Sequence, residues 1–131
     1  MRRITRIAVA GMLAAAPIAT TVGATSALAG DDDVIRTGSC SGASDWKLKL
    51  SPEDGRLEVE FEVDQNVVGD MWRVKMRRNG EVFASARATT TAPSGSFEVR
   101  RLATDGAGTD RFRVRAVNVS TGETCVGAAS I

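Results

Sequence analysis

The chain has 131 residues, of which 17 are Lys or Arg and 16 are Asp or Glu, and its formal net charge is +1. It contains no histidine, which excludes a serine–histidine–aspartate triad and a histidine-ligated zinc site. The balanced charge gives no reason to expect a nucleic-acid-binding protein.

The first 29 residues have the pattern of a secretory signal peptide. A basic start at residues 1–6 precedes an apolar stretch at 7–16, and the small residues Ala27 and Ala29 form a signal-peptidase site. We expect cleavage before Gly30 and an extracellular mature protein. A membrane-spanning helix needs about 20 apolar residues. The apolar stretch is shorter and no second one follows, so we expect no membrane attachment after cleavage.

Residues 30–131 are long enough for one domain. Loss of the three signal-peptide arginines leaves 14 basic and 16 acidic residues, a formal net charge of −2. In an exported chain, Cys40 and Cys125 are expected to pair, which stabilises a fold by about 4–5 kcal/mol in a chain-entropy model. The predicted organisation is a signal peptide at 1–29, an acidic N-terminal segment with Cys40 at 30–43, and a β-sandwich domain at 44–131.

Apolar and polar residues alternate through most of the mature chain, which is typical of strands with one buried face. Asn79-Gly80, between two such runs, indicates a tight hairpin. Strands at nearly even spacing predict an all-β, two-sheet sandwich. Seven strands are expected, at 46–50, 57–63, 72–77, 81–88, 96–102, 111–117 and 124–129.

The inward positions of these strands predict the hydrophobic core. The segment before Cys40 is expected to be loose, with room for at most a short strand at 34–36. The expected core residues are Trp46, Leu48, Leu50, Leu57, Val59, Phe61, Trp72, Val74, Met76, Phe97, Val99, Phe112 and Val114.

Two stretches resemble the fibronectin type III family and related immunoglobulin-like domains. Residues 110–118 with the following turn at 120–123 are similar to the sixth strand of those domains, and residues 72–80 are similar to the third. The resemblance spans 45–131 and implies a seven-stranded sandwich, whereas fold alone does not imply function. The chain departs from the pattern at Phe112, where such domains often carry tyrosine, and it lacks their usual tryptophan on the second strand.

Charge is segregated along the chain. Residues 31–70 carry 11 acids and four bases, and residues 71–115 carry 10 bases and four acids. The alternation directs most of these side chains outward, where they form one acidic stripe and two basic stripes. The acidic stripe is Glu58, Glu60 and Glu62, and the basic stripes are Arg73, Lys75 and Arg77 and then Arg111, Arg113 and Arg115.

The effect of these stripes depends on the sheet topology. In the fold implied by the resemblance, the third and sixth strands are neighbours and the second lies in the opposite sheet. The basic stripes then merge into a positive face that could dock an extracellular protein or an anionic glycan. Two alternatives remain open. The stripes could be ordinary solvated faces that guard against aggregation, or another topology could pair the acidic stripe with a basic one and cancel the field.

Three short motifs each have two interpretations. Residues 105–110 faintly resemble a calcium loop, but two carboxylates are too few for calcium, and turn chemistry accounts for them. Asn118-Val119-Ser120 matches the glycan acceptor pattern. Val67-Val68-Gly69 is an apolar loop tip that is either a contact point or, as we expect, tucked into the end of the core.

We expect a non-enzymatic binding or interaction domain without a cofactor or metal. A serine nucleophile would need a lysine base, and Lys47, Lys49 and Lys75 lie on exposed strand faces. The alternative is a secreted inhibitor of an extracellular hydrolase that presents the loop at 89–95. A third hypothesis is a small-ligand carrier similar to the immunoglobulin-like apoproteins of reactive antibiotics, although those have two disulfides and this chain can form one.

Overall fold

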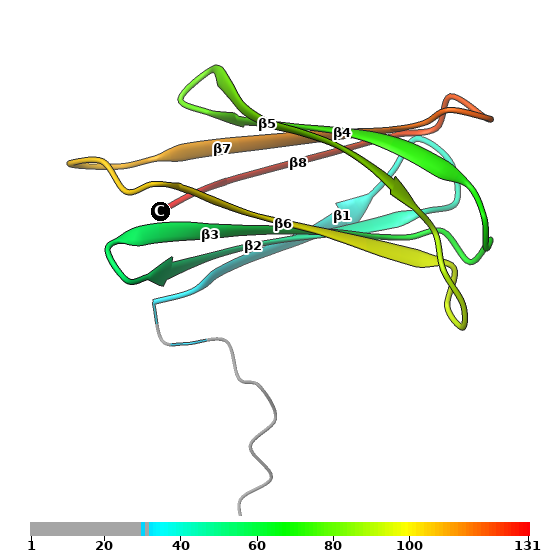
Figure 1. The fold of residues 1–131 in the computed structure, drawn as a ribbon, viewed down its shortest axis with the longest axis horizontal. Helices are drawn as coiled ribbons and strands as arrows, with labels where there is room; N and C mark the ends of the chain where they lie inside the picture. Colours follow the sequence, from blue (N-terminus) through cyan, green and yellow to red (C-terminus); the bar gives the residue numbers. More distant parts are fainter. Residues whose placement is uncertain (1–29, 31) are drawn as a thin grey trace, which may run out of the picture.

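The computed structural model describes Gly30 and residues 32–131, and the predicted signal peptide lies outside the described residues. The described chain is all-β (Figure 1). Its eight strands are β1 (Val34–Ser39), β2 (Asp45–Glu53), β3 (Arg56–Asp64), β4 (Met71–Arg78), β5 (Glu81–Thr89), β6 (Ser96–Thr104), β7 (Arg111–Asn118) and β8 (Thr124–Ser130).

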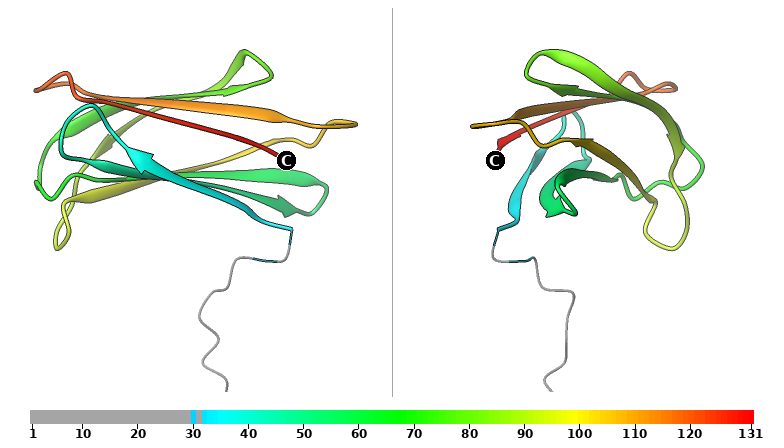
Figure 2. Two further views of the ribbon diagram at one scale, coloured as in Figure 1. Left: turned by 180° about the vertical axis from the view of Figure 1, so that it is seen from behind. Right: turned by 60° about the vertical axis from the view of Figure 1, so that its left-hand side comes forward.

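The strands form two antiparallel sheets packed face to face as two layers (Figures 1 and 2). Sheet A has the order β1-β2-β3-β6, and sheet B has the order β5-β4-β7-β8. The expected neighbours are confirmed, because β4 pairs with β7 while β3 lies in the other sheet. The topology that pairs the acidic stripe with the first basic stripe is therefore excluded.

The prediction of seven strands is wrong, because β1 is a full strand that pairs with β2 over six residues. It extends sheet A into the segment expected to be loose. As an edge strand, β1 is mostly exposed and has no strict apolar alternation. Its main-chain hydrogen bonds to β2 rather than a buried face hold it in place, and period-two patterning cannot detect such a strand.

The predicted core is confirmed at twelve of its thirteen positions, all of which are buried between the sheets. Trp46 is half-buried and stacks on Phe61, with ring centroids 6.0 Å apart. The prediction missed five further buried residues on both sheets. They are Val63, Ala103, Ala116, Cys125 and Ala129.

A disulfide joins the two sheets, as predicted. Cys40, just after β1, is bonded to Cys125 on β8, 85 residues further along the chain. Beside it, the Glu123 carboxylate accepts hydrogen bonds from the main-chain amide and hydroxyl of Ser44. The covalent bond and this polar contact fix the β1–β2 loop against the end of sheet B.

The predicted hairpin is present between β4 and β5. Asn79 and Gly80 adopt left-handed φ angles of 50° and 88°, which a two-residue turn between twisted strands requires. A β-bulge shifts the β4–β5 register between Met76 and Arg77. No helix among the described residues is long and apolar enough to cross a membrane.

Candidate functional site

The outer face of sheet B carries the predicted basic stripes. Along β4, buried Trp72, Val74 and Met76 alternate with the three cations of the first stripe. Along β7, Phe112 and Val114 are buried in the same way between the cations of the second stripe. Because successive strand residues point to opposite faces, both stripes project from the same side of the sheet.

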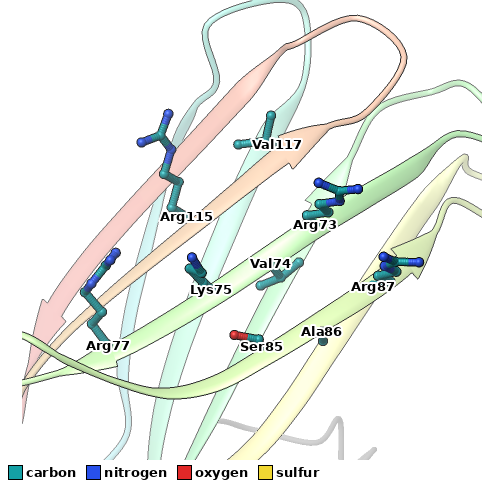
Figure 3. A pocket seen from close by; sticks show the side chains of 9 residues that line it. All are labelled: Arg73, Val74, Lys75, Arg77, Ser85, Ala86, Arg87, Arg115 and Val117. Atoms are coloured by element: carbon teal, nitrogen blue, oxygen red, sulfur yellow. The ribbon is translucent and has the colours of Figure 1, made fainter.

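The strand register brings the stripes into direct opposition. Lys75 lies opposite Arg115, and Arg77 lies opposite Arg113. Arg111 continues the row beside Ser130 of β8. All six predicted residues therefore share one face, and Figure 3 shows four of them projecting from it.

Sequence reasoning missed a seventh cation on this face, Arg87 of β5. Without the bulge, the Asn79-Gly80 turn would set Arg87 opposite Trp72, on the inner side of the sheet. The bulge moves it by one residue, so that Arg87 lies opposite Arg73 and is exposed. The high cost of burying an arginine is the signal that could have indicated this shift. The seven residues Arg73, Lys75, Arg77, Arg87, Arg111, Arg113 and Arg115 are called the basic face below.

An open depression of about 750 Å³ lies on the basic face (Figure 3). Five cations line it, together with Ser85, Val117 and the β4 and β5 segments at Val74 and Ala86, whose side chains face the core. The lining cations are Arg73, Lys75, Arg77, Arg87 and Arg115. Guanidinium groups present several N–H donors in a plane that matches carboxylate, phosphate and sulfate oxygens, so the depression is suited to an oxyanion.

No residue of the basic face forms an ion pair within the described part of the chain. Three pairs of cations lie directly opposite one another instead: Arg73 and Arg87, Lys75 and Arg115, and Arg77 and Arg113. Opposed residues have Cβ atoms about 5 Å apart, and like charges at that spacing destabilise a sheet. The face therefore concentrates positive charge at a cost to the fold.

The outer face of sheet A is different, because acids and bases are mixed on it. It still holds two pairs of opposed acids, Glu62 with Glu98 and Asp45 with Asp64. The acidic stripe on β3 lies between Lys47 and Lys49 of β2 on one side and β6 on the other. On β6, Arg100 approaches Glu58, Glu60 and Glu98 at 3.4, 3.2 and 3.1 Å. These carboxylates raise the pKa of Arg100.

The calcium interpretation of residues 105–110 finds no support in the geometry. Asp110 is buried and forms a 2.6 Å ion pair with Arg78. Burial alone would raise the pKa of Asp110, but hydrogen bonds from the Gly106 amide, Arg78 and Asn79 outweigh it and lower the pKa. Among the described residues, no three metal-ligating side chains are grouped to hold an ion.

Asn118 of the glycan acceptor pattern is fully buried. Its amide donates to Asp70, and its side-chain oxygen accepts hydrogen bonds from the amides of Ser120 and Thr121. The side chain thus closes the β7–β8 turn and is not accessible for glycosylation in the folded domain.

The loop at 89–95, considered for hydrolase inhibition, is folded on itself. The Thr91 amide donates to Ser96, and the Gly95 amide donates to Thr91. Thr90 is buried and is held by backbone hydrogen bonds to Gly69 and Asp70. This compact turn differs from the extended segment that a hydrolase cleft accepts.

Comparison with protein-family models and with curated proteins found no match to this chain.

Proposed function

We propose that this chain is an exported, non-enzymatic binding domain of the fibronectin type III or immunoglobulin-like class that docks an anionic partner through the basic face. The class is supported by the strand arrangement, since β4 and β7 are neighbours and β3 lies in the other sheet. Export is supported by the signal-peptide pattern and by the disulfide, because disulfides persist in oxidising compartments.

The observation that carries the proposal is the contrast between the two outer faces. Sheet A mixes acids and bases, and Arg100 alone approaches three glutamates. Its like-charge pairs, Glu62 with Glu98 and Asp45 with Asp64, lie on a face that also carries cations. Sheet B opposes cations across three strands and has no acid among the residues that line its depression. A purely structural role for charged strand faces predicts mixed charge, whereas an anion-binding role predicts this one-sided arrangement.

A binding role also fits the chemistry of the depression better than catalysis does. Its one hydroxyl, that of Ser85, has only cationic neighbours among the charged residues that line the depression. Activation of a hydroxyl nucleophile needs an adjacent base. The lining residues instead provide N–H donors and positive charge, which hold an anion without reacting with it.

Retention on an immobilised sulfated polymer, heparin, tests this function. Residues 30–131 contain both sheets, the core and the disulfide, so this segment is the folded unit to use. We expect retention at about 0.1 M salt, where the screening length is about 10 Å. The triple variant Arg73→Gln, Lys75→Gln and Arg115→Gln should elute at much lower salt.

A matched variant removes the same charge from sheet A. Arg36→Gln, Lys47→Gln and Lys49→Gln lower the net charge equally but leave the basic face intact, so this variant should elute close to the wild type. Equal loss of retention in both triple variants would show that only net charge matters. That result, or flow-through of the wild type, would overturn the proposal.

A further inference from the structure

The β3–β4, β5–β6 and β7–β8 loops lie at one end of the sandwich (Figure 1, right). Four exposed apolar side chains belong to this end of the domain. Val67 and Val68, in the β3–β4 loop, are 48% and 56% exposed. Met71, at the start of β4, and Val119, just after β7, are 38% and 46% exposed. The expectation that the valines tuck into the core is therefore wrong. These four residues are called the apolar tip.

The apolar tip has a fixed shape. Asn66 and Gly69 on either side of the two valines adopt left-handed φ angles of 62° and 96°. The Gly69 amide donates to Thr90, and a Cβ atom at Gly95 would lie 2.5 Å from the amide nitrogen of Val67. The backbone of the β3–β4 loop thus packs against the β5–β6 loop at Thr90 and Gly95. This packing leaves the valine side chains exposed and outside the core.

The apolar tip adjoins the basic face. Met71 lies two residues before Arg73 on the same side of β4, a spacing of about 7 Å along a strand. Arg73 in turn lies opposite both Arg87 of β5 and Val117 of β7. The Val119 amide donates to the Met71 carbonyl at 2.9 Å. The outer face of sheet B therefore passes from apolar to strongly cationic within one or two residues along its strands.

The acidic residues at this end of the molecule either lie on sheet A, away from the basic face, or are engaged in hydrogen bonds. Asp45 and Asp64 are paired strand ends of sheet A, on the far side from the basic face. Asp70 accepts hydrogen bonds from the Asn118 and Gln65 side chains, which lower its pKa. Glu123 binds Ser44. One orientation thus presents the apolar tip and the nearest cations of the basic face together, with Asp45 and Asp64 away from the contact.

We infer that the anionic partner of the basic face is the surface of a lipid bilayer, into which the apolar tip inserts. The inference rests on the proposed function. Stable attachment to a membrane surface takes two signals, such as an apolar group together with a basic patch, and this end of the domain supplies both. A protein partner would need about 800 Å² of complementary surface, whereas acyl chains can surround a projecting tip of four residues.

This attachment is peripheral and needs no spanning segment. It departs from the expectation that the mature chain has no membrane attachment, which rested on the lack of a second apolar stretch. Arg73 and Arg87 lie at the level of the lipid headgroups when Val67 and Val68 enter the acyl region. Each cation near an anionic surface contributes about 1 kcal/mol, or about fivefold in partitioning. The more distant cations Arg111 and Arg113 contribute less, because their attraction is screened over about 8–10 Å.

Co-sedimentation of residues 30–131 with lipid vesicles tests the inference. The vesicles are equimolar phosphatidylglycerol and phosphatidylcholine, with pure phosphatidylcholine as the neutral comparison. We expect partitioning onto the anionic vesicles only. The variant Val67→Ser, Val68→Ser should partition about tenfold less, and Arg73→Gln, Arg87→Gln should partition about twentyfold less.

Val82→Ser is the matched control for the valine variant. Val82 is 47% exposed on sheet B but lies at the opposite, β4–β5 hairpin end, so its replacement should leave partitioning unchanged. Unchanged partitioning of the Val67→Ser, Val68→Ser variant, or equal binding to neutral vesicles, would overturn the inference.

The heparin column separates this inference from the function on which it depends. Retention on the column without partitioning onto anionic vesicles would leave the proposed function standing and identify a soluble polyanion as the partner. Failure on the column and on vesicles would overturn both.

Discussion

Lys75 of β4 and Arg115 of β7 lie directly opposite one another on the outer face of sheet B, two positive charges in register on neighbouring strands. Neither forms an ion pair in the described chain. Their repulsion opposes folding, and the pairs Arg77–Arg113 and Arg73–Arg87 repeat the arrangement beside them. An anion bound between such pairs would relieve the repulsion, which links the stability of sheet B to occupation of the basic face.

The replacement Lys75→Glu should stabilise the domain while weakening its binding to anions. A glutamate at this position faces Arg115 and has Arg73 and Arg77 on the same strand, so repulsion becomes attraction. Favourable cross-strand charge pairs contribute about 0.2–1 kcal/mol, and removal of the repulsion adds to this. Urea denaturation at low salt should give a higher free energy of unfolding, and the gain should shrink as salt screens the charges.

The same change on sheet A should have the opposite effect. Lys49 lies opposite Glu60, so Lys49→Glu places two carboxylates in register and should lower stability by a similar amount. Equal effects of Lys75→Glu and Lys49→Glu on the free energy of unfolding would contradict the assignment of an uncompensated positive face to sheet B.

The basic face could be predicted from the sequence only as far as strict alternation extends. The period-two pattern assigned Arg73, Lys75 and Arg77 to the outside of their strand, and the structure agrees. Arg87 was missed because the bulge between Met76 and Arg77 changes which side of β5 it occupies, and no residue pattern in the hairpin marks that bulge.

Two other features could not be predicted from the sequence: strand β1 and the exposure of Val67 and Val68. Both are set by the main chain and not by the burial of apolar side chains. Strand β1 is held by its pairing with β2 and buries little, so apolar periodicity could not define it. Val67 and Val68 are apolar, and hydropathy for that reason predicts an interior position for them. Their exposure is set by the left-handed backbone at Asn66 and Gly69 and by the close contact of Gly95, which hydropathy does not report.

Asp110→Asn should destabilise the domain strongly at neutral pH. The change removes the anionic partner of Arg78, whose Nε is buried without a hydrogen bond among the described atoms. Loss of one member of a buried ion pair costs about 3–5 kcal/mol, and the partial exposure of Arg78 places the expected loss near the lower limit. Asp105→Asn, an exposed change in the same loop, should alter stability by less than about 0.5 kcal/mol.

The pH dependence of stability gives an independent check on Asp110. Its pKa in the folded domain is lowered from the ordinary value of 3.8, so its contribution is fully present above 3.8 and is lost as the pH falls through the lowered value. The wild type should therefore lose stability with acid more steeply than Asp110→Asn. Parallel pH profiles of unfolding free energy for the two proteins would rule out a stabilising role for the charged carboxylate.

Removal of the disulfide should destabilise the domain without changing the strand arrangement. Cys40 and Cys125 close a loop of 85 residues, for which the chain-entropy model predicts about 4–5 kcal/mol. The double variant Cys40→Ala, Cys125→Ala should show this loss in urea denaturation while retaining the β-sheet circular dichroism of the wild type. Addition of a thiol reductant should destabilise the wild type and leave the double variant unaffected. A loss below about 1 kcal/mol would show that the bond constrains the unfolded chain far less than its loop length implies.

Gly127→Ala should destabilise the domain because the Trp46 indole occupies the space of the missing side chain. A Cβ atom at Gly127 would lie 2.9 Å from both the Trp46 and Phe61 rings. The indole cannot move toward β1, because its other edge already packs against Gly38. An added Cβ atom there would lie 2.6 Å from the ring. Overpacking of this kind costs about 1–3 kcal/mol, measured as a lower free energy of unfolding.

Two further variants separate this steric effect from a general effect of changing β8. Ala128→Ser, the exposed neighbouring position, should remain within about 0.5 kcal/mol of the wild type. Trp46→Phe, which replaces the indole with a smaller ring, should be less harmful in the Gly127→Ala background than in the wild type, because the two side chains compete for the same space. Additive losses in this double-mutant cycle would show that Trp46 is not the group that excludes a side chain at Gly127.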